Sequence, residues 1–197
     1  MVYKHSGYAE AAMASPLPVS VLIMAGGRGS RMLNPSKPLL AVGGQSLLER
    51  IFSIAKPMSQ QVYLCASPNA PEVADFARSM GINIVEGSGE DYSRDLSLCL
   101  SFIREKTVLI LPADIFIIHE QLFGESVNMA MESKSAISTV LQKGEFIGIS
   151  IYNREGVQDD QWDFISIEVP ARFCINVNTP EDLQEARHFI EHQWSQH

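Results

Sequence analysis

Cysteine, positive charge and long apolar runs are all scarce in this sequence of 197 residues. Cys65, Cys99 and Cys174 are isolated and odd in number, so neither a disulfide framework nor a zinc site is predicted, and a reducing cytoplasm is the simplest setting. No apolar run approaches the length of a membrane span, so we expect a soluble protein. Lys and Arg number 15 against 23 Asp and Glu, and this net charge of -8 argues against a nucleic-acid partner.

An apolar fraction of 46% and this chain length are typical of one α/β domain. Residues 1–18 show neither helical nor strand periodicity and end in Pro16 and Pro18, so we interpret them as a mobile N-terminal extension. Residues 19–197 are expected to form the single domain. Whether the chain forms a homodimer stays open.

A glycine-rich loop follows the first predicted strand, residues 19–24. It consists of Ala25, Gly26, Gly27, Arg28, Gly29 and Ser30, and it continues to Arg31 and Lys37. Glycine lacks a Cβ, so the backbone can bring its N–H groups directly against a polyanion. Three cations within ten residues of an acidic chain favour phosphate binding over a flexible surface loop. The spacing matches neither the P-loop nor the dinucleotide fingerprint.

Strands alternate with helices along the rest of the chain. The predicted strands are 19–24, 61–66, 82–85 and 107–111, with later β character at 136–141, 146–152, 162–169 and 172–177. The predicted helices are 46–55, 72–80, 92–104, 119–133 and one capped by Thr179, and 38–42 is expected to be extended. This alternation predicts a three-layer α/β/α, Rossmann-like fold with a mostly parallel sheet, in which ligands bind at the carboxyl ends of the strands.

Polar residues follow several of these strands. The strand 107–111 is fully apolar, so it is expected at the sheet centre, and it delivers Asp114 at its carboxyl end. Asp114 and Asn178 are candidate ligands for a divalent metal, which would neutralise a triphosphate. The alternatives are a turn-capping role for Asp114 and a hydrogen bond bracing the last helix for Asn178. Other candidate ligand loops are 67–69 and 87–92.

The glycine-rich loop resembles the L-x-A-G-G-x-G-x-R-M…K-P-L signature of nucleotidyltransferases, which move a nucleoside monophosphate from an NTP to an acceptor phosphate. The matching positions are Leu22, Ala25, Gly26, Gly27, Gly29, Arg31, Met32, Lys37, Pro38 and Leu39. Residues 66–71, 87–96, 113–115 and 176–183 are in addition similar to motifs of the archaeal-type adenosylcobinamide-phosphate guanylyltransferases of cobalamin synthesis. Ala113 and Ile115 depart mildly from that pattern. The molybdenum-cofactor guanylyltransferases share the closing motif but usually carry a G-P-x-x-G loop that this sequence lacks.

The resemblance implies a nucleotidyltransferase-type fold of the GT-A kind, GTP as the substrate and Mg2+ as the divalent metal. Arg31 and Lys37 would contact the reacting phosphorus, while Asp114 and Asn178 would hold the metal. The glycine-rich loop, with Arg28 and Ser30, would hold the outgoing pyrophosphate. Guanine would be read by Ser67, Asn69, Gly87 and Gly89.

The acceptor implied is adenosylcobinamide phosphate, a phosphorylated small molecule. Molybdopterin or a sugar phosphate are alternatives, and so is a nucleotide-binding regulatory module without turnover. A lysine in a polar loop is expected to bury little surface, so Lys37 should contribute little to stability.

Overall fold

The structure is a computed structural model that describes residues 19–26, 34–157 and 162–194. The predicted extension, residues 1–18, therefore lies outside the described part of the chain. Within the described ranges, no helix combines the length and the apolar character that a membrane crossing requires.

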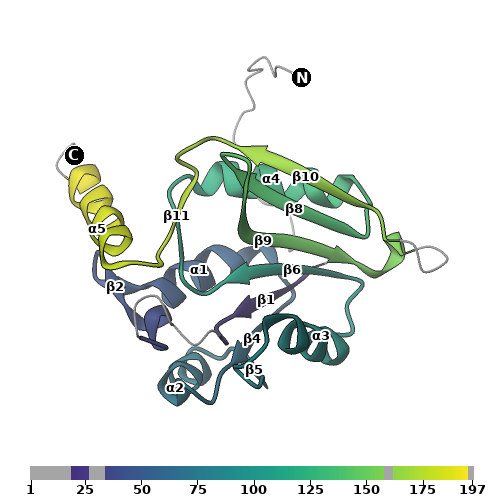
Figure 1. Cartoon of the computed structure of the whole chain (residues 1–197), viewed down its shortest axis with the longest axis horizontal. Coiled ribbons are helices and arrows are strands. Elements are labelled where there is room, and N and C mark those ends of the chain that lie inside the picture. The colour runs from purple at the N-terminus through teal and green to yellow at the C-terminus, as the bar shows by residue number, and fades with distance from the viewer. Residues whose placement is uncertain (1–18, 27–33, 158–161, 195–197) are drawn as a thin grey trace.

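Seven strands form the central sheet in the order β10-β8-β9-β6-β1-β4-β5 (Figure 1). They are β1 (Ser20–Met24), β4 (Gln61–Ala66), β5 (Asn83–Glu86), β6 (Thr107–Pro112), β8 (Ile137–Gln142), β9 (Glu145–Asn153) and β10 (Phe164–Val169). The pairs β5-β4, β4-β1, β1-β6 and β8-β10 are parallel, whereas β6-β9 and β9-β8 are antiparallel. The apolar strand β6 occupies the middle position, which confirms the prediction made from its composition.

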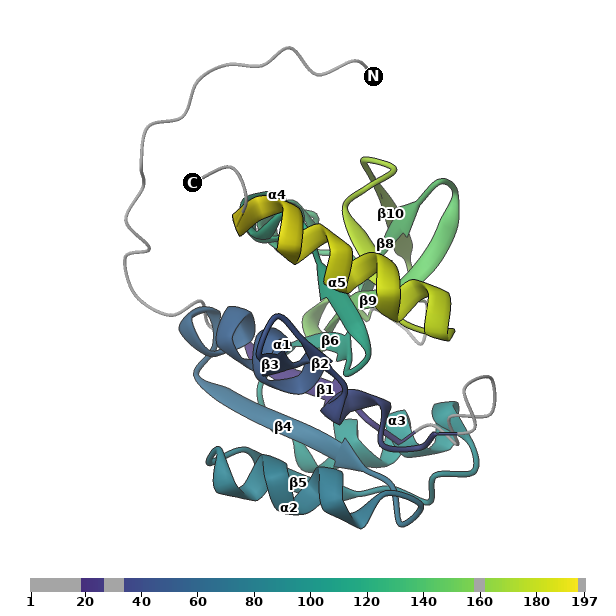
Figure 2. The same cartoon turned by 90° about the vertical axis from the view of Figure 1, so that its left-hand side faces the viewer.

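Helices cover both faces of this sheet. They are α1 (Leu47–Ala55), α2 (Pro71–Ser79), α3 (Tyr92–Phe102), α4 (Glu120–Glu132) and α5 (Pro180–Trp194). Alternate residues of β1 point to opposite faces: Val21 and Ile23 belong to the core shared with α1, α2 and α4, whereas Leu22 and Met24 pack with α3. Figure 2 shows α1 and α3 on opposite sides of β1. The predicted three-layer α/β/α, Rossmann-like class is confirmed.

Short elements connect the large ones. They are the 3-10 helices Lys37–Leu39, Lys56–Met58 and Arg154–Gly156 and the strands β2 (Ala41–Val42), β3 (Gln45–Ser46), β7 (Ile115–Ile117) and β11 (Cys174–Asn176). The extended segment expected over 38–42 was wrong in its first half, because Pro38 sits inside a 3-10 turn closed by the Leu40 N–H donating to the Lys37 carbonyl.

The strand predicted over 172–177 does not join the main sheet. Its ordered part, β11, pairs antiparallel with β7, which begins directly after Asp114. Helix α5 packs on β2 and β11 through a separate apolar cluster that includes Leu183 and Ala186, and Figure 1 shows it beside β2 at one end of the molecule. This side arrangement carries the end of β11 to the carboxyl edge of the main sheet.

Candidate active site

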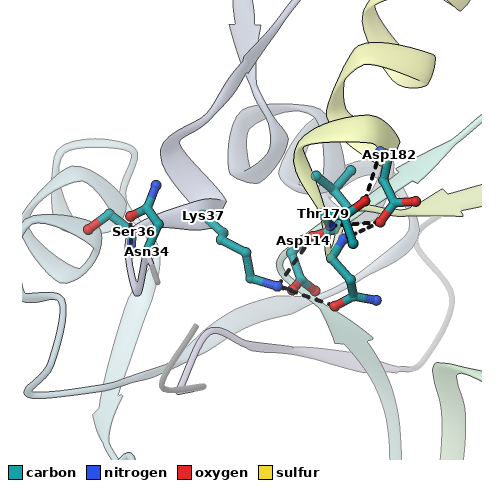
Figure 3. Close-up of polar contacts among 8 residues, drawn as sticks. Asn34, Ser36, Lys37, Asp114, Thr179 and Asp182 are labelled. Atoms are coloured by element: carbon teal, nitrogen blue, oxygen red, sulfur yellow. Dashed lines mark hydrogen bonds and ion pairs between the residues drawn. The ribbon is translucent and has the colours of Figure 1, made fainter. Parts of the chain in front are cut away.

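Lys37 is a buried lysine whose ammonium is surrounded by oxygen atoms. Only 9% of the residue is exposed. Its Nζ donates to Asp114 Oδ2 at 2.5 Å, to the Val177 carbonyl at 3.2 Å and to Asn178 Oδ1 at 3.3 Å (Figure 3). The expectation that Lys37 buries little surface was therefore wrong, because the turn at Pro38 directs the side chain inward. The three predicted residues Lys37, Asp114 and Asn178 do lie together.

The segment before Lys37 is fixed by local hydrogen bonds. Asn34 Oδ1 accepts from the Ser36 N–H at 2.9 Å, and the Ser36 carbonyl accepts from the Leu39 N–H at 2.9 Å. The Ser36 hydroxyl also donates to the carboxylate of Glu72, near the start of α2. Glu72 thus links the Lys37 turn to a helix that follows β4.

Asp114 lies where two parts of the fold meet. The chain after β6 is joined to β1 by the Ala113 N–H, which donates to the Met24 carbonyl at 3.0 Å. It is joined to the end of β11 by the Val177 N–H, which donates to the Asp114 carbonyl at 2.9 Å. The Asp114 side chain is 24% exposed and pairs with a cation, so it does not cap the following turn. A buried carboxylate is costly without such a partner.

The last helix presents Asn178 through its capping residues. Thr179 Oγ1 accepts from the Asp182 N–H at 3.2 Å, and Asp182 Oδ2 accepts from the N–H groups of Thr179 and Asn178 at 2.7 and 2.8 Å. Thr179 thus caps the helix as predicted, in a capping box that is extended by one residue. The backbone of Asn178 braces the helix, so its side-chain oxygen remains available to Lys37.

These oxygens suit a hard divalent cation. No group of three or more His, Cys, Asp or Glu side chains gathers in the ranges that the structure describes. However, Mg2+ is commonly held by one or two carboxylates together with substrate phosphates, and the Asp114 carboxylate, the Asn178 amide oxygen and the Val177 carbonyl are ligands of the right type. The Lys37 ammonium bonded to all three shows that the group accepts a cation.

The loops predicted to read the base form a second cluster, at the ends of β4 and β5. Ser67 Oγ accepts from the Asn69 N–H at 3.1 Å, and Asn69 Nδ2 donates to the Gly89 carbonyl at 3.4 Å. Gly89 has a φ of +69°, and a Cβ there would lie 2.3 Å from Ser67 Oγ, so glycine is required. A hollow of about 200 Å3 opens beside Ser67 and Gly87.

Gly26 begins the glycine-rich loop and lies near Asp95 and Cys65. Ala25, its neighbour, donates from its N–H to the Cys65 carbonyl at 3.0 Å, and a Cβ on Gly26 would lie 3.5 Å from Asp95 Oδ2. Asp95 belongs to the motif over residues 87–96, but no role was predicted for it. The signal that the sequence offered for a role of Asp95 was its position in this motif, seven residues after Ser88. Gly27, Arg28, Gly29, Ser30 and Arg31 lie outside the described residues.

The mostly parallel sheet, with polar side chains gathered at the carboxyl ends of its strands, is the arrangement in which α/β folds bind ligands. The chain belongs to the MobA-like NTP transferase domain family, which matches residues 21–162. The predicted enzyme class, nucleotidyltransferase, is therefore confirmed.

Particular relatives are similar over most of their length. The adenosylcobinamide-phosphate guanylyltransferase of Methanocaldococcus jannaschii is 24% identical over 198 residues, which cover 88% of this chain and 98% of that protein. The molybdenum cofactor guanylyltransferase of Pseudomonas fluorescens (strain SBW25) is 28% identical, with coverages of 87% and 94%. The structure of CMP:2-keto-3-deoxy-manno-octonic acid synthetase with CTP superposes with a TM-score of 0.68 at 13% identity, over 91% of this chain and 100% of that one, and supports the fold.

Proposed function

We propose that this nucleotidyltransferase moves GMP from GTP to a phosphate monoester. An acceptor oxygen would attack the α-phosphorus, the bond from the α-phosphorus to the bridging oxygen would break, and pyrophosphate would leave. The observation that carries the proposal is the buried Lys37 ammonium held by Asp114, Asn178 and the Val177 carbonyl near the carboxyl end of β1. The domain performing this reaction comprises residues 19–197, in a cytoplasmic setting.

Positioning and electrostatics are sufficient for this chemistry. A phosphate monoester has a second pKa near 6, so it is largely dianionic at neutral pH and needs no general base. Lys37 is oriented by three oxygen partners, and we assign it with Arg31 to the oxygens of the reacting phosphorus. A fixed cation stabilises charge that develops in the transition state without having to reorganise.

Asp114 and Asn178 would hold the divalent metal, which we propose to be Mg2+. When bound, such a cation neutralises charge on the phosphate oxygens. Lys37 pairs with the same carboxylate in the structure, so it shares Asp114 with the metal or moves toward the nucleotide phosphates.

The remaining predicted residues have nucleotide-binding roles in this proposal. Phosphates would be held by the loop of Ala25, Gly26, Gly27, Arg28, Gly29 and Ser30. Guanine would be read by Ser67, Asn69, Gly87 and Gly89. Gly26 lies near Asp95, which accepts from the Ser88 and Gly89 N–H groups, and this supports one continuous nucleotide site.

The proposed acceptor is adenosylcobinamide phosphate. The Methanocaldococcus jannaschii relative is matched along nearly its whole length, and the motifs at 66–71 and 87–96 favour that group. Molybdenum cofactor is the second candidate, because its guanylyltransferase from Pseudomonas fluorescens has the higher identity. The same transfer of GMP would take place with either acceptor.

Calorimetric titration tests the nucleotide. We expect GTP to bind more tightly than ATP, CTP and UTP in the presence of Mg2+. Equal or tighter binding of another triphosphate would show that the guanine assignment is wrong and would leave the family assignment intact.

Pyrophosphate release tests the acceptor. The enzyme with GTP would be offered adenosylcobinamide phosphate, molybdopterin and a panel of sugar phosphates, and only the first should give rapid release. The variant Lys37→Ala should release pyrophosphate about 100-fold more slowly, whereas Lys56→Ala, which changes an exposed lysine, should retain the activity. Release with GTP and molybdopterin alone would transfer the assignment to the second candidate.

A further inference from the structure

The loop after β5, residues 87–90, which we call the base loop, has no free backbone donor among its four residues. The Gly87 N–H donates to the Ala66 carbonyl at 2.9 Å. The Ser88 and Gly89 N–H groups donate to Asp95 Oδ1 and Oδ2 at 2.7 and 2.9 Å. The Glu90 N–H donates to Ser88 Oγ at 3.2 Å. All four donors are therefore used inside the protein.

Asp95 accepts the hydrogen bonds of two of these four N–H groups. It lies in the first turns of α3, is only 3% exposed, and accepts a third hydrogen bond from the Ser88 hydroxyl at 2.8 Å. Burial alone raises the pKa of this carboxyl, but the hydrogen bonds from Ser88 and Gly89 outweigh it and hold the pKa below its ordinary value. Asp95 is thus an ionised acceptor that amide donors satisfy.

The base loop passes close to the Asp95 carboxylate. A Cβ on Gly87 would lie 2.9 Å from Asp95 Cγ, so only glycine lets the loop pass this close to the side chain. The Gly89 carbonyl is occupied by Asn69 Nδ2 at 3.4 Å. Within the described residues, nothing donates to the carbonyls of Gly87 and Ser88. The base loop therefore offers acceptors to a ligand and withholds donors.

An acceptor-only loop selects among nucleobases. The edge of guanine carries two adjacent donors, N1–H and the 2-amino group, whereas adenine places an acceptor at N1 and has one amino group. A site that pairs a polar group of its ligand rejects an analogue that lacks that group, because a buried partner is then left unsatisfied. Guanine is the base that matches two adjacent carbonyls.

We propose that Asp95 is a positioning residue that sets base specificity. It draws the Ser88 and Gly89 N–H groups inward and leaves the Gly87 and Ser88 carbonyls to accept from N1–H and the 2-amino group of guanine. This inference rests on the proposed function, since it explains how that function selects GTP. Asp95 itself touches neither the nucleotide nor the reacting atoms.

Binding of three ligands to Asp95→Asn tests the role. The ligands are GTP, ITP, which lacks the 2-amino group, and tripolyphosphate, which lacks the base. We expect the wild type to bind GTP at least about tenfold more tightly than ITP, as the loss of one buried partner implies. The variant presents an amide donor where an acceptor stood, so its ratio should fall to about twofold or less, with tripolyphosphate affinity unchanged.

Asp91→Asn is the matched control. Asp91 caps the same helix and accepts from the Arg94 N–H, and Asn caps a helix as well as Asp does, so its GTP/ITP ratio should equal that of the wild type. If Asp95→Asn fails to fold, Ser88→Ala serves, because it removes one of the three donors to Asp95 and should lower the ratio in part.

Three outcomes would overturn the inference. One is a GTP/ITP ratio preserved in a folded Asp95→Asn. Another is an equal loss of affinity for all three ligands, which would mark a merely structural role. The third is an unchanged ratio in Ser88→Ala when Asp95→Asn does not fold. Failure of the proposed function looks different, since the wild type would then bind another triphosphate as tightly as GTP.

Discussion

A half-buried carboxylate, Asp114, and a buried one, Asp95, stand at the same edge of the sheet, and they are satisfied by different partners. Asp114 is paired with the ammonium of the Lys37 side chain. Asp95 is satisfied by the N–H groups and the hydroxyl of the base loop, which belong to the fold. In the proposed function a metal would take the place of Lys37 at Asp114, whereas the partners of Asp95 would stay in place. The first carboxylate is therefore suited to chemistry, and the second to holding shape.

Asp114→Asn should have the largest effect on activity. It removes the negative charge of the proposed metal site but keeps the side-chain volume and an oxygen that accepts from Lys37. We expect turnover to fall by roughly 100- to 1,000-fold, the scale of losing one preorganised electrostatic group. Pyrophosphate release across a Mg2+ titration measures it, with Asp75→Asn, an exposed carboxylate beside Arg78, as the control. Unchanged turnover would return Asp114 to a structural role.

Lys37→Ala should lower turnover by about 100-fold and GTP affinity by less, because the contact strengthens as charge develops. Pyrophosphate release and calorimetric titration measure the two effects separately. If affinity and turnover fell by the same factor, Lys37 would be a binding residue and Arg31 would take the catalytic assignment.

Stability gives Lys37 a second test, for which Lys37→Met keeps most of the buried volume. Leaving Asp114 without its cation should cost about 1–3 kcal/mol in the free energy of unfolding, measured with denaturant. Added Mg2+ should restore stability in this variant more than it raises that of the wild type, because the metal replaces the ammonium. An equal response of both proteins would show that Lys37 and the metal do not share Asp114.

Gly89→Ala probes the second cluster. Its positive φ and the close approach to Ser67 Oγ should together cost about 1–3 kcal/mol in the free energy of unfolding and weaken GTP binding. Gly81→Ala is the control, since Gly81 has a similar φ of +75° but open space around it, and it should cost only about 1 kcal/mol. If both variants lost the same free energy of unfolding, the Ser67 side chain would move away from the added methyl group without a measurable cost.

The smallest expected effect is the pH dependence of the Asp95 hydrogen bonds. The folded-state pKa is depressed below the ordinary 3.8, so the stabilisation is complete above that value and is lost as pH falls through the folded pKa. The stability difference between wild type and Asp95→Asn should accordingly be constant from pH 7 to 5 and shrink below about pH 4. Denaturant unfolding at several pH values measures it. A difference that grows on acidification would mean that the folded-state pKa of Asp95 is raised rather than depressed.

Local features of this protein were determined by the sequence alone. The cap of the last helix at Thr179 forms as predicted, because it depends on residues within one helical turn. The central place of β6 followed from its unbroken apolar run, since such a strand must be covered on both faces. The grouping of ligand loops at one edge followed from the parallel strands.

Only the tertiary structure decided which of these residues meet. Lys37 is 77 residues from Asp114 and 140 from Val177, and its burial depends on the pairing of β11 with β7. The segment that contains β11 was predicted as β, but β7 has only three residues and carries too little periodicity to be predicted, so their pairing was invisible in the sequence. Asp95 likewise looked like one more polar residue on a helix. Its role depends on the distance between α3 and the end of β5, and such distances are set by the packing of the whole sheet rather than by any local pattern.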